Sequence, residues 1–122
     1  MKNIKITDVK KLLKLFVKSK ESILLIDGFK IKNKEKYSLF LKKGLKCKCC
    51  GLKPYFISIE TDNNCKNGFA FLTVYGNIGK TNIKMTIDHI IPKALGGRDE
   101  IDNYQILCEI CNREKGDKII IY

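Results

Sequence analysis

The only histidine of this 122-residue chain, His89, directly follows Asp88 at the end of an apolar, strand-like stretch. An imidazole accepts a proton near neutral pH, so a histidine at such a place can act as a general base. Asp88 offers a carboxylate oxygen, and Asn112 offers an amide oxygen further along the chain. Oxygen ligands of this kind favour Mg²⁺ or Mn²⁺. Taken alone, an Asp-His pair is weak evidence for a catalytic site, because a lone histidine is more often structural.

The end of this strand decides whether Asp88 and His89 can act together. Neighbouring residues of a strand point to opposite faces, so the two side chains cannot share one site unless the strand ends there. Ile90, Ile91 and Pro92 follow at once, and proline cannot donate to a sheet ladder. We therefore expect the chain to turn directly after His89.

Two Cys-x-x-Cys pairs flank this segment in the sequence. Together they offer four thiolates to one tetrahedral zinc ion, and the Asp-His segment lies between them. Such an ion would tie together the two ends of the site and contribute to folding. Buried free cysteines and a redox pair are the alternatives, but a redox motif does not explain the second pair. The expected ligands are Cys47, Cys50, Cys108 and Cys111, which leaves Cys49 and Cys65 without a role.

Whether these cysteines bind metal or form disulfides depends on the cellular compartment. The N-terminus lacks the apolar region of an export signal, and no apolar run approaches the length of a membrane span. We therefore expect a soluble, cytoplasmic protein whose thiols stay reduced and bind metal before they form disulfides.

The net charge of +11 is large for this length. It predicts a positive surface that attracts polyanions, with nucleic acid as the first candidate and an anionic membrane as the second. A compositional preference for lysine is the alternative explanation, since Arg98 and Arg113 are the only arginines.

Hydrophobic periodicity predicts an α+β chain in one compact domain, with residues 1–44 as an N-terminal helical part packed on a core formed by residues 45–122. Thr7 is expected to cap a first helix, and residues 34–43 to form a second that ends at Gly44. Residues 22–26 fit either a strand or a helix end. Strands are expected at 55–60, 69–75 and 83–87, a short helix near the second cysteine pair, and a last strand at 118–122.

The string from Asp88 to Gly97 (DHIIPKALGG), followed by DNYQILCEICNREKG and preceded by a Cys-x-x-Cys-Gly knuckle, resembles the HNH endonucleases. It is most similar to the zinc-stapled subgroup found among restriction, phage and homing nucleases. The resemblance covers residues 83–116 densely and 47–51 thinly. It implies a ββα-metal (His-Me finger) core with a four-cysteine zinc site, to which this chain adds a β-hairpin between Cys50 and Asp88.

The resemblance also implies roles for individual residues. His89 matches the general base, and Asn103 matches the middle asparagine that braces the loop and orients the histidine. Asn112 matches the last signature position and, with Asp88, would hold a catalytic Mg²⁺ or Mn²⁺. The basic residues Arg98, Arg113 and Lys115 are expected to contact phosphates, although solvent exposure explains Arg98 equally well.

These features imply a metal-dependent DNA endonuclease, a monomer or homodimer acting on double-stranded DNA and not on membranes. The alternative is a zinc-stapled nucleic-acid-binding module without catalysis, and a nuclease fold used only as an interaction part is a third. The full set of Asp88, His89, Asn103 and Asn112 favours the enzyme, because a pure binding module does not need it.

Overall fold

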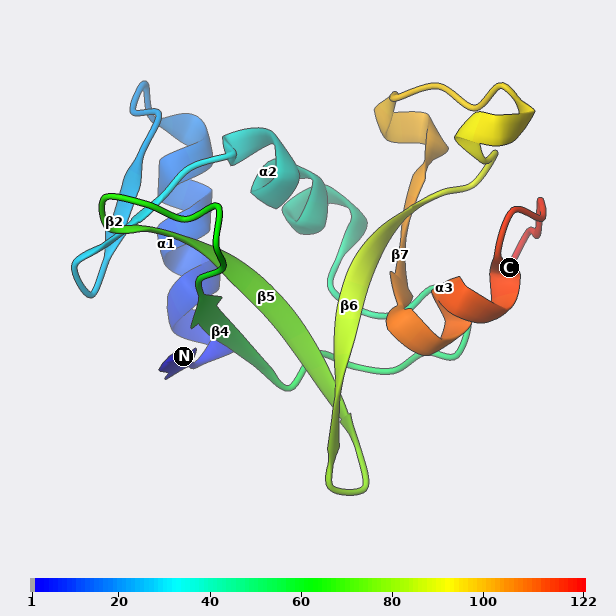
Figure 1. Cartoon of the computed structure of the whole chain (residues 1–122), viewed down its shortest axis with the longest axis horizontal. Helices are drawn as coiled ribbons and strands as arrows, with labels where there is room; N and C mark the ends of the chain where they lie inside the picture. The colour runs from blue at the N-terminus through cyan, green and yellow to red at the C-terminus, as the bar shows by residue number, and fades with distance from the viewer. Residues whose placement is uncertain (1) are drawn as a thin grey trace.

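The ten-residue strand β5 (Phe69–Ile78) organises the sheet in the computed structural model, which describes residues 2–122. One edge of β5 pairs antiparallel with β4 (Phe56–Glu60). Two strands share the other edge of β5. Strand β3 (Phe29–Ile31) runs parallel to the first residues of β5, and β6 (Thr81–His89) runs antiparallel to the last residues of β5. The sheet therefore branches at β5, and β5 and β6 diverge beyond their short paired region (Figure 1).

The N-terminal part is not purely helical, contrary to the expectation. It contains helices α1 (Ile6–Lys18) and α2 (Lys34–Lys43), but also β1 (Lys2–Ile4), which pairs with β4, and a hairpin of β2 (Leu24–Ile26) and β3. The hairpin turns at Asp27 and Gly28, which have φ angles of 48° and 80°. The sequence of residues 22–26 is compatible with a strand or with the end of a helix. These residues contain strand β2, which belongs to the same sheet as β4 and β5.

Helix α1 begins earlier than expected, because Lys5 and not Thr7 is its N-cap residue. Strand β1 leads almost directly into the helix, so Thr7 already lies in the first turn. The buried side of α1 is formed by Val9, Leu13 and Phe16, a stripe with helical spacing. Helix α2 ends as expected at Gly44, whose φ of 85° suits a residue without a Cβ atom.

The hydrophobic core lies where α1 and α2 pack on the sheet (Figure 1). Tyr37 of α2 is buried there, and its hydroxyl accepts a hydrogen bond from the backbone N–H of Leu72 at 3.0 Å. This bond satisfies a polar group that burial would otherwise leave unpaired. The core side chains of the sheet include Ile57, Ile59, Leu72 and Val74.

The C-terminal part runs strand, strand, helix. Strand β7 (Tyr104–Cys108) pairs antiparallel with β6 from Met85 opposite Cys108 to His89 opposite Tyr104, and α3 (Glu109–Lys115) follows β7 directly. Two short 3₁₀ segments, Lys93–Leu95 and Ile101–Asn103, form the connection between the strands. The expected short helix and the added antiparallel pair β4–β5 are both confirmed.

The expected strand at 118–122 is wrong. The structure assigns no strand to these residues, and Ile121 is 90% exposed. An apolar run forms a strand only when a sheet edge is available to it, and this run does not reach one. None of the helices in residues 2–122 is long and apolar enough to cross a membrane.

Candidate nuclease site

Strand β6 ends at His89, and a pocket of about 280 Å³ opens at this end. Asp88, His89 and Asn112 all line it, so the structure brings three of the four expected catalytic positions together. Asn112 reaches the pocket from α3, which packs against β6 and β7. Asn103 lies outside the pocket lining, in the second 3₁₀ segment.

Asp88 is held from two sides and is only 8% exposed. Gln105, its partner across the β6–β7 ladder, donates from Nε2 to Oδ2 of Asp88 at 2.9 Å. Lys115 places its Nζ 3.2 Å from the same oxygen. Both donors therefore engage Oδ2, and in residues 2–122 no protein donor is bonded to Oδ1. Oδ1 is the oxygen that remains for a cation.

Lys115 does not lie where a phosphate contact requires it. Its side chain is 0% exposed, and Nζ also donates to the backbone oxygen of His89 at 3.0 Å. A buried lysine is stable only with partners for its charge and its protons, and Asp88 and His89 supply them. The expectation that Lys115 grips nucleic acid is therefore replaced by an internal role, in which it ties the end of α3 to the end of β6.

The orientation of the Asn112 amide follows from its neighbour Thr86. The Thr86 hydroxyl donates its one proton to the carbonyl oxygen of Leu107 at 2.7 Å. It can therefore only accept from Asn112, whose Nδ2 lies 2.8 Å away. With the nitrogen turned to Thr86, the amide oxygen of Asn112 points the other way and is the atom available to a ligand.

Asn103 fastens the loop that follows His89. Its Oδ1 accepts from the backbone N–H of Ile91 at 2.8 Å, while Nδ2 donates to the carbonyl oxygens of Ile91 and Arg98 at 3.0 and 2.9 Å. The loop approaches itself closely at Gly97, where a Cβ atom would lie 1.7 Å from the carbonyl oxygen of Ile91. The Gly96-Gly97 pair thus serves the loop's shape.

His89 has a partner that the sequence analysis missed. Its Nε2 lies 2.7 Å from Oδ1 of Asp99, and Oδ2 of Asp99 lies 2.9 Å from Nζ of Lys93. The hydrogen bond from His89, followed by that from Lys93, lowers the pKa of the Asp99 carboxyl. An ionised Asp99 accepts a proton-bearing Nε2, which leaves Nδ1 of the neutral ring as the basic nitrogen. The ring of Tyr104 meets that of His89 edge-on, with centroids 5.0 Å apart.

The four expected zinc ligands form one cluster. The Sγ atoms of Cys47, Cys50, Cys108 and Cys111 all lie within 4.8 Å of one another. Sulfurs bound at about 2.3 Å to a tetrahedral zinc ion lie about 3.8 Å apart. The Cys50–Cys108 distance of 3.9 Å matches this value. The donor set and its spacing therefore fit zinc, and Cys49 and Cys65 lie outside the cluster.

Burial and mutual contact perturb these thiols in opposite directions. Burial opposes ionisation of Cys47, but hydrogen bonds from the backbone amides of Cys108, Cys50 and Cys49 outweigh it and bring its pKa to about 7. Burial and the neighbouring thiols raise the pKa of Cys111. Four thiolates at this spacing repel one another, so a divalent cation is what allows all four to lose their protons.

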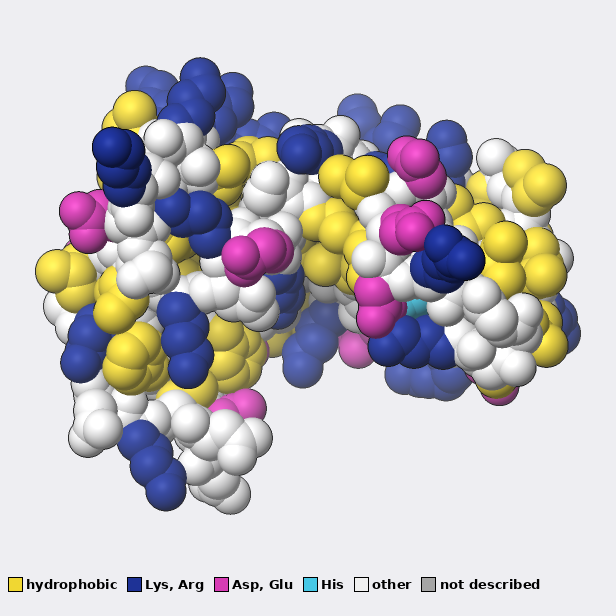
Figure 2. Space-filling model, turned by 90° about the horizontal axis from the view of Figure 1, so that it is seen from above, with side chains coloured by type: hydrophobic (Ala, Val, Ile, Leu, Met, Phe, Trp, Pro, Cys, Tyr) yellow, Lys and Arg dark blue, Asp and Glu magenta, His cyan; other side chains and the backbone are white. Residues whose placement is uncertain are grey.

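Lys93 is the basic residue that lines the pocket, and the two arginines of the C-terminal part are exposed. Arg98 is 80% exposed and lies 3.6 Å from Glu100, and Arg113 is exposed on α3. Viewed from above, the single histidine lies among charged and polar side chains on the half formed by the C-terminal part (Figure 2). The outline is indented between this half and the half that carries the N-terminal elements.

Residues 76–120 match the family of HNH endonucleases. The matched residues contain β6, β7 and α3, so the segment that forms the pocket at His89 is similar to the HNH endonucleases. No curated protein and no solved structure matches the chain. The family acts on nucleic acid with a divalent metal, and the chain has the pocket and the four-cysteine cluster that such an activity can use.

Proposed function

We propose that this protein is a metal-dependent endonuclease that hydrolyses phosphodiester bonds of double-stranded DNA, by nicking or by cutting both strands. The observation that carries the proposal is the meeting of Asp88, His89 and Asn112 in one pocket of an HNH-family segment. A protein that only binds nucleic acid needs positive charge, but it does not need a histidine, a carboxylate and an amide oriented toward one pocket.

Asp88 and Asn112 fit a hard divalent cation. The carboxylate keeps one oxygen free of protein donors, and the amide presents its oxygen because Thr86 holds its nitrogen. A Mg²⁺ or Mn²⁺ ion held by these two residues would supply positive charge against the phosphate and the leaving oxygen. The buried Lys115 balances the carboxylate charge and fixes the position of Asp88.

His89 takes the role of general base. Asp99 holds Nε2 with its proton, so Nδ1 can accept the proton of the attacking water. Asn103 is a positioning residue. It holds the loop that carries Lys93 and Asp99, and thereby keeps Asp99 beside His89. Arg98 and Arg113 are exposed near this site and are the side chains we assign to phosphate contacts.

A zinc ion on the four cysteines completes a ββα-metal core of the zinc-stapled type. It joins the segment before β4 to the start of α3, and Asn112 directly follows the last cysteine ligand. The structural ion would thereby position a ligand of the catalytic one. We assign residues 45–122 to the nuclease domain and residues 1–44 to an N-terminal extension packed on it.

Plasmid cleavage with a panel of metals tests the proposal. The wild-type protein with Mg²⁺ or Mn²⁺ should nick or linearise supercoiled DNA, and EDTA should stop the reaction. His89→Ala should lose at least about a hundredfold in rate while DNA binding is retained. DNA binding without cleavage under any divalent ion would overturn the enzyme and favour the non-catalytic binding module.

A further inference from the structure

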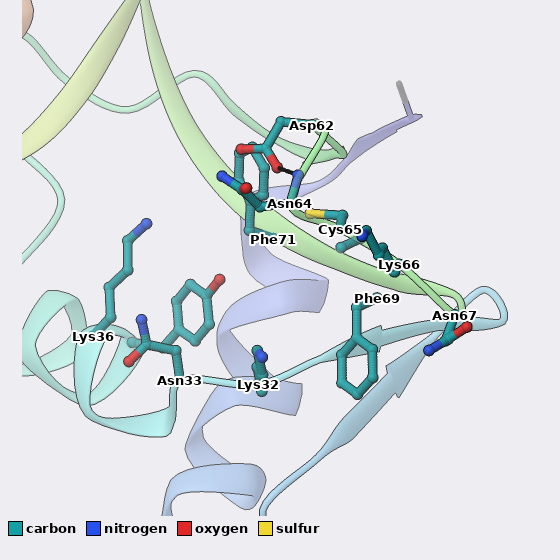
Figure 3. Close-up of a pocket in the computed structure, with 12 residues that line it drawn as sticks. Lys32, Asn33, Lys36, Asp62, Asn64, Cys65, Lys66, Asn67, Phe69 and Phe71 are labelled. Atoms are coloured by element: carbon teal, nitrogen blue, oxygen red, sulfur yellow. Dashed lines mark hydrogen bonds between the residues drawn. The ribbon is translucent and has the colours of Figure 1, made fainter.

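A second pocket, of about 410 Å³, shares no lining residue with the pocket at His89. It is enclosed by the start of α2, the start of β5 and the connection between β4 and β5 (Figure 3). Its volume lies within the range of about 300–1,000 Å³ that is typical of ligand sites. None of its residues belongs to the segment that matches the HNH family.

The charge of this second pocket is mainly positive. Lys32, Lys36 and Lys66 line it, against one acidic residue, Asp62. The Asp62 carboxylate is occupied within its own turn, where it accepts the backbone N–H of Asn64 at 2.8 Å. In the described chain none of the three lysines forms an ion pair with a protein carboxylate. The positive charges of the three lysines are thus not balanced by protein carboxylates in the pocket.

Burial destabilises the charged form of Lys36. Its side chain is half-buried, and in residues 2–122 its amine forms no hydrogen bond or ion pair. Nζ lies 5.9 Å from the centre of the Tyr37 ring. Burial lowers the pKa of the Lys36 amine, because the charged form has lost part of its water. An anionic ligand in the pocket would compensate for that loss.

Aromatic rings stand beside these lysines. Phe69 and Phe71 line the pocket from β5, and both are half-buried. Nζ of Lys32 lies 5.1 Å from the centre of the Phe69 ring, and Figure 3 shows the two side chains on the same side of the pocket. Asn33 and Asn64 add amide groups that can donate to phosphate or base edges. Lysines interleaved with aromatic rings are the composition of surfaces that bind nucleotides of an unpaired strand.

We propose that this pocket binds a phosphate-bearing nucleotide in an unpaired part of the DNA substrate, at a point away from the phosphodiester that is cut. The inference rests on the proposed function, because it takes DNA as the ligand of the whole molecule. The N-terminal half would then anchor the substrate while the HNH segment cleaves it.

The test compares two triple variants with the same change in net charge. The pocket variant carries Lys32→Gln, Lys36→Gln and Lys66→Gln. The control carries Lys11→Gln, Lys14→Gln and Lys18→Gln on the exposed side of α1. Binding of a fluorescein-labelled duplex with a single-stranded end is measured by anisotropy, without added Mg²⁺ or Mn²⁺, between 50 and 200 mM salt. Leaving out the catalytic ion prevents cleavage, while the zinc of the four cysteines and the lysine–phosphate contacts stay in place.

The pocket variant should bind the DNA at least about tenfold more weakly, and its log–log salt slope should be shallower by about two to three, roughly 0.9 for each lost contact. The control should change that slope by less than about one. The single variant Lys66→Glu, on an exposed loop, should also weaken binding and guards against a folding defect in the triple variant. Equal losses in the two triple variants would overturn the inference.

Two further arms separate this inference from the proposed function. If the wild-type protein binds DNA but never cleaves it, the enzyme fails, while the comparison of the two triple variants still decides the pocket. If ATP, used as a free nucleotide probe, binds the pocket but the triple variant keeps full DNA affinity, the pocket serves a free nucleotide and the inference is wrong.

Discussion

Lys115 and Asp88 form a buried ion pair between the last turn of α3 and the end of β6, with Nζ 3.2 Å from Oδ2. The same amine donates to the backbone oxygen of His89, so one side chain fixes both residues of the Asp-His pair. The pair joins two of the three elements of the HNH segment at the point where its chemistry is expected. It explains why a lysine at this position is needed inside the protein and not on its surface.

Lys115→Met should destabilise the protein by about 3–5 kcal/mol, because it leaves the Asp88 carboxylate buried without its cation. Urea unfolding measures the loss. The double variant Lys115→Met/Asp88→Asn should recover part of it, since it removes the unpaired charge as well. A Lys115→Met protein as stable as the wild type would show that the pair contributes nothing.

Cys108→Ser should lose zinc and lower the melting temperature, because a structural zinc site contributes its binding free energy to folding. Metal content of the purified protein is measured together with thermal unfolding. Cys65→Ser is the matched control, since Cys65 lies outside the four-cysteine cluster, and it should keep both zinc and stability. If Cys108→Ser retains wild-type zinc content, these four cysteines do not form the site.

Local patterns predict the parts of this fold whose contacts are local. Alternation and aromatic residues indicate β4 and β5, and Gly44 correctly ends α2. The spacing of two Cys-x-x-Cys pairs predicts the cluster, because each knuckle fixes the geometry of its own two sulfurs. The turn after His89 follows from Pro92, which ends ladder pairing whatever the rest of the chain does.

The remaining features depend on contacts between distant segments. The parallel pairing of β3 with β5 requires residues that are far apart in the sequence, and three-residue strands leave little periodicity to read. The burial of Lys115 depends on how α3 lies against β6, and a lysine at a helix end is normally exposed. Asp99 meets His89 only because Asn103 and Gly97 fold the loop back. An acidic residue in this loop is the only signal the sequence offers for it.

Thr86→Val should lower the cleavage rate by about 10- to 100-fold, the usual effect of losing a side chain that orients a metal ligand. Without the hydroxyl, the Asn112 amide is free to turn and to present nitrogen to the pocket. Thr86→Ser keeps the acceptor and should retain most activity. Single-turnover cleavage at saturating Mg²⁺ and DNA is the measurement, and equal rates for the two variants would exclude the orienting role.

Asp99→Ala should lower kcat by at least about tenfold with little change in KM, because the Nε2 proton of His89 loses its acceptor. Asp99→Asn keeps an acceptor oxygen in place and should recover a large part of the rate. Lys93→Met tests the other partner of Asp99 and should have the smaller effect, since it leaves the contact with His89 intact. If Asp99→Ala cleaves DNA at the wild-type rate, the contact does not position the base.

Tyr75→Phe should make the stability of the protein less dependent on pH in alkaline solution. Burial and then the hydrogen bond to Glu60, at 2.6 Å, raise the pKa of Tyr75 from 10.0 to about 12. A group whose pKa is higher in the folded state contributes stability that is fully present below its unfolded pKa and is lost as the pH rises through the folded pKa. The wild type should therefore lose stability between about pH 10 and 12 more steeply than Tyr75→Phe.

Lysine side chains also titrate between about pH 10 and 12. The test therefore compares the pH dependence of stability of the wild type with that of Tyr75→Phe, and does not interpret either profile alone. Urea midpoints are measured from pH 9 to 12 for the wild type, Tyr75→Phe and Tyr55→Phe. Tyr55 is 68% exposed, and in residues 2–122 its side chain makes no hydrogen bond, so its variant should follow the wild-type profile. Parallel profiles for the wild type and Tyr75→Phe would mean that the bond between Tyr75 and Glu60 does not couple to folding.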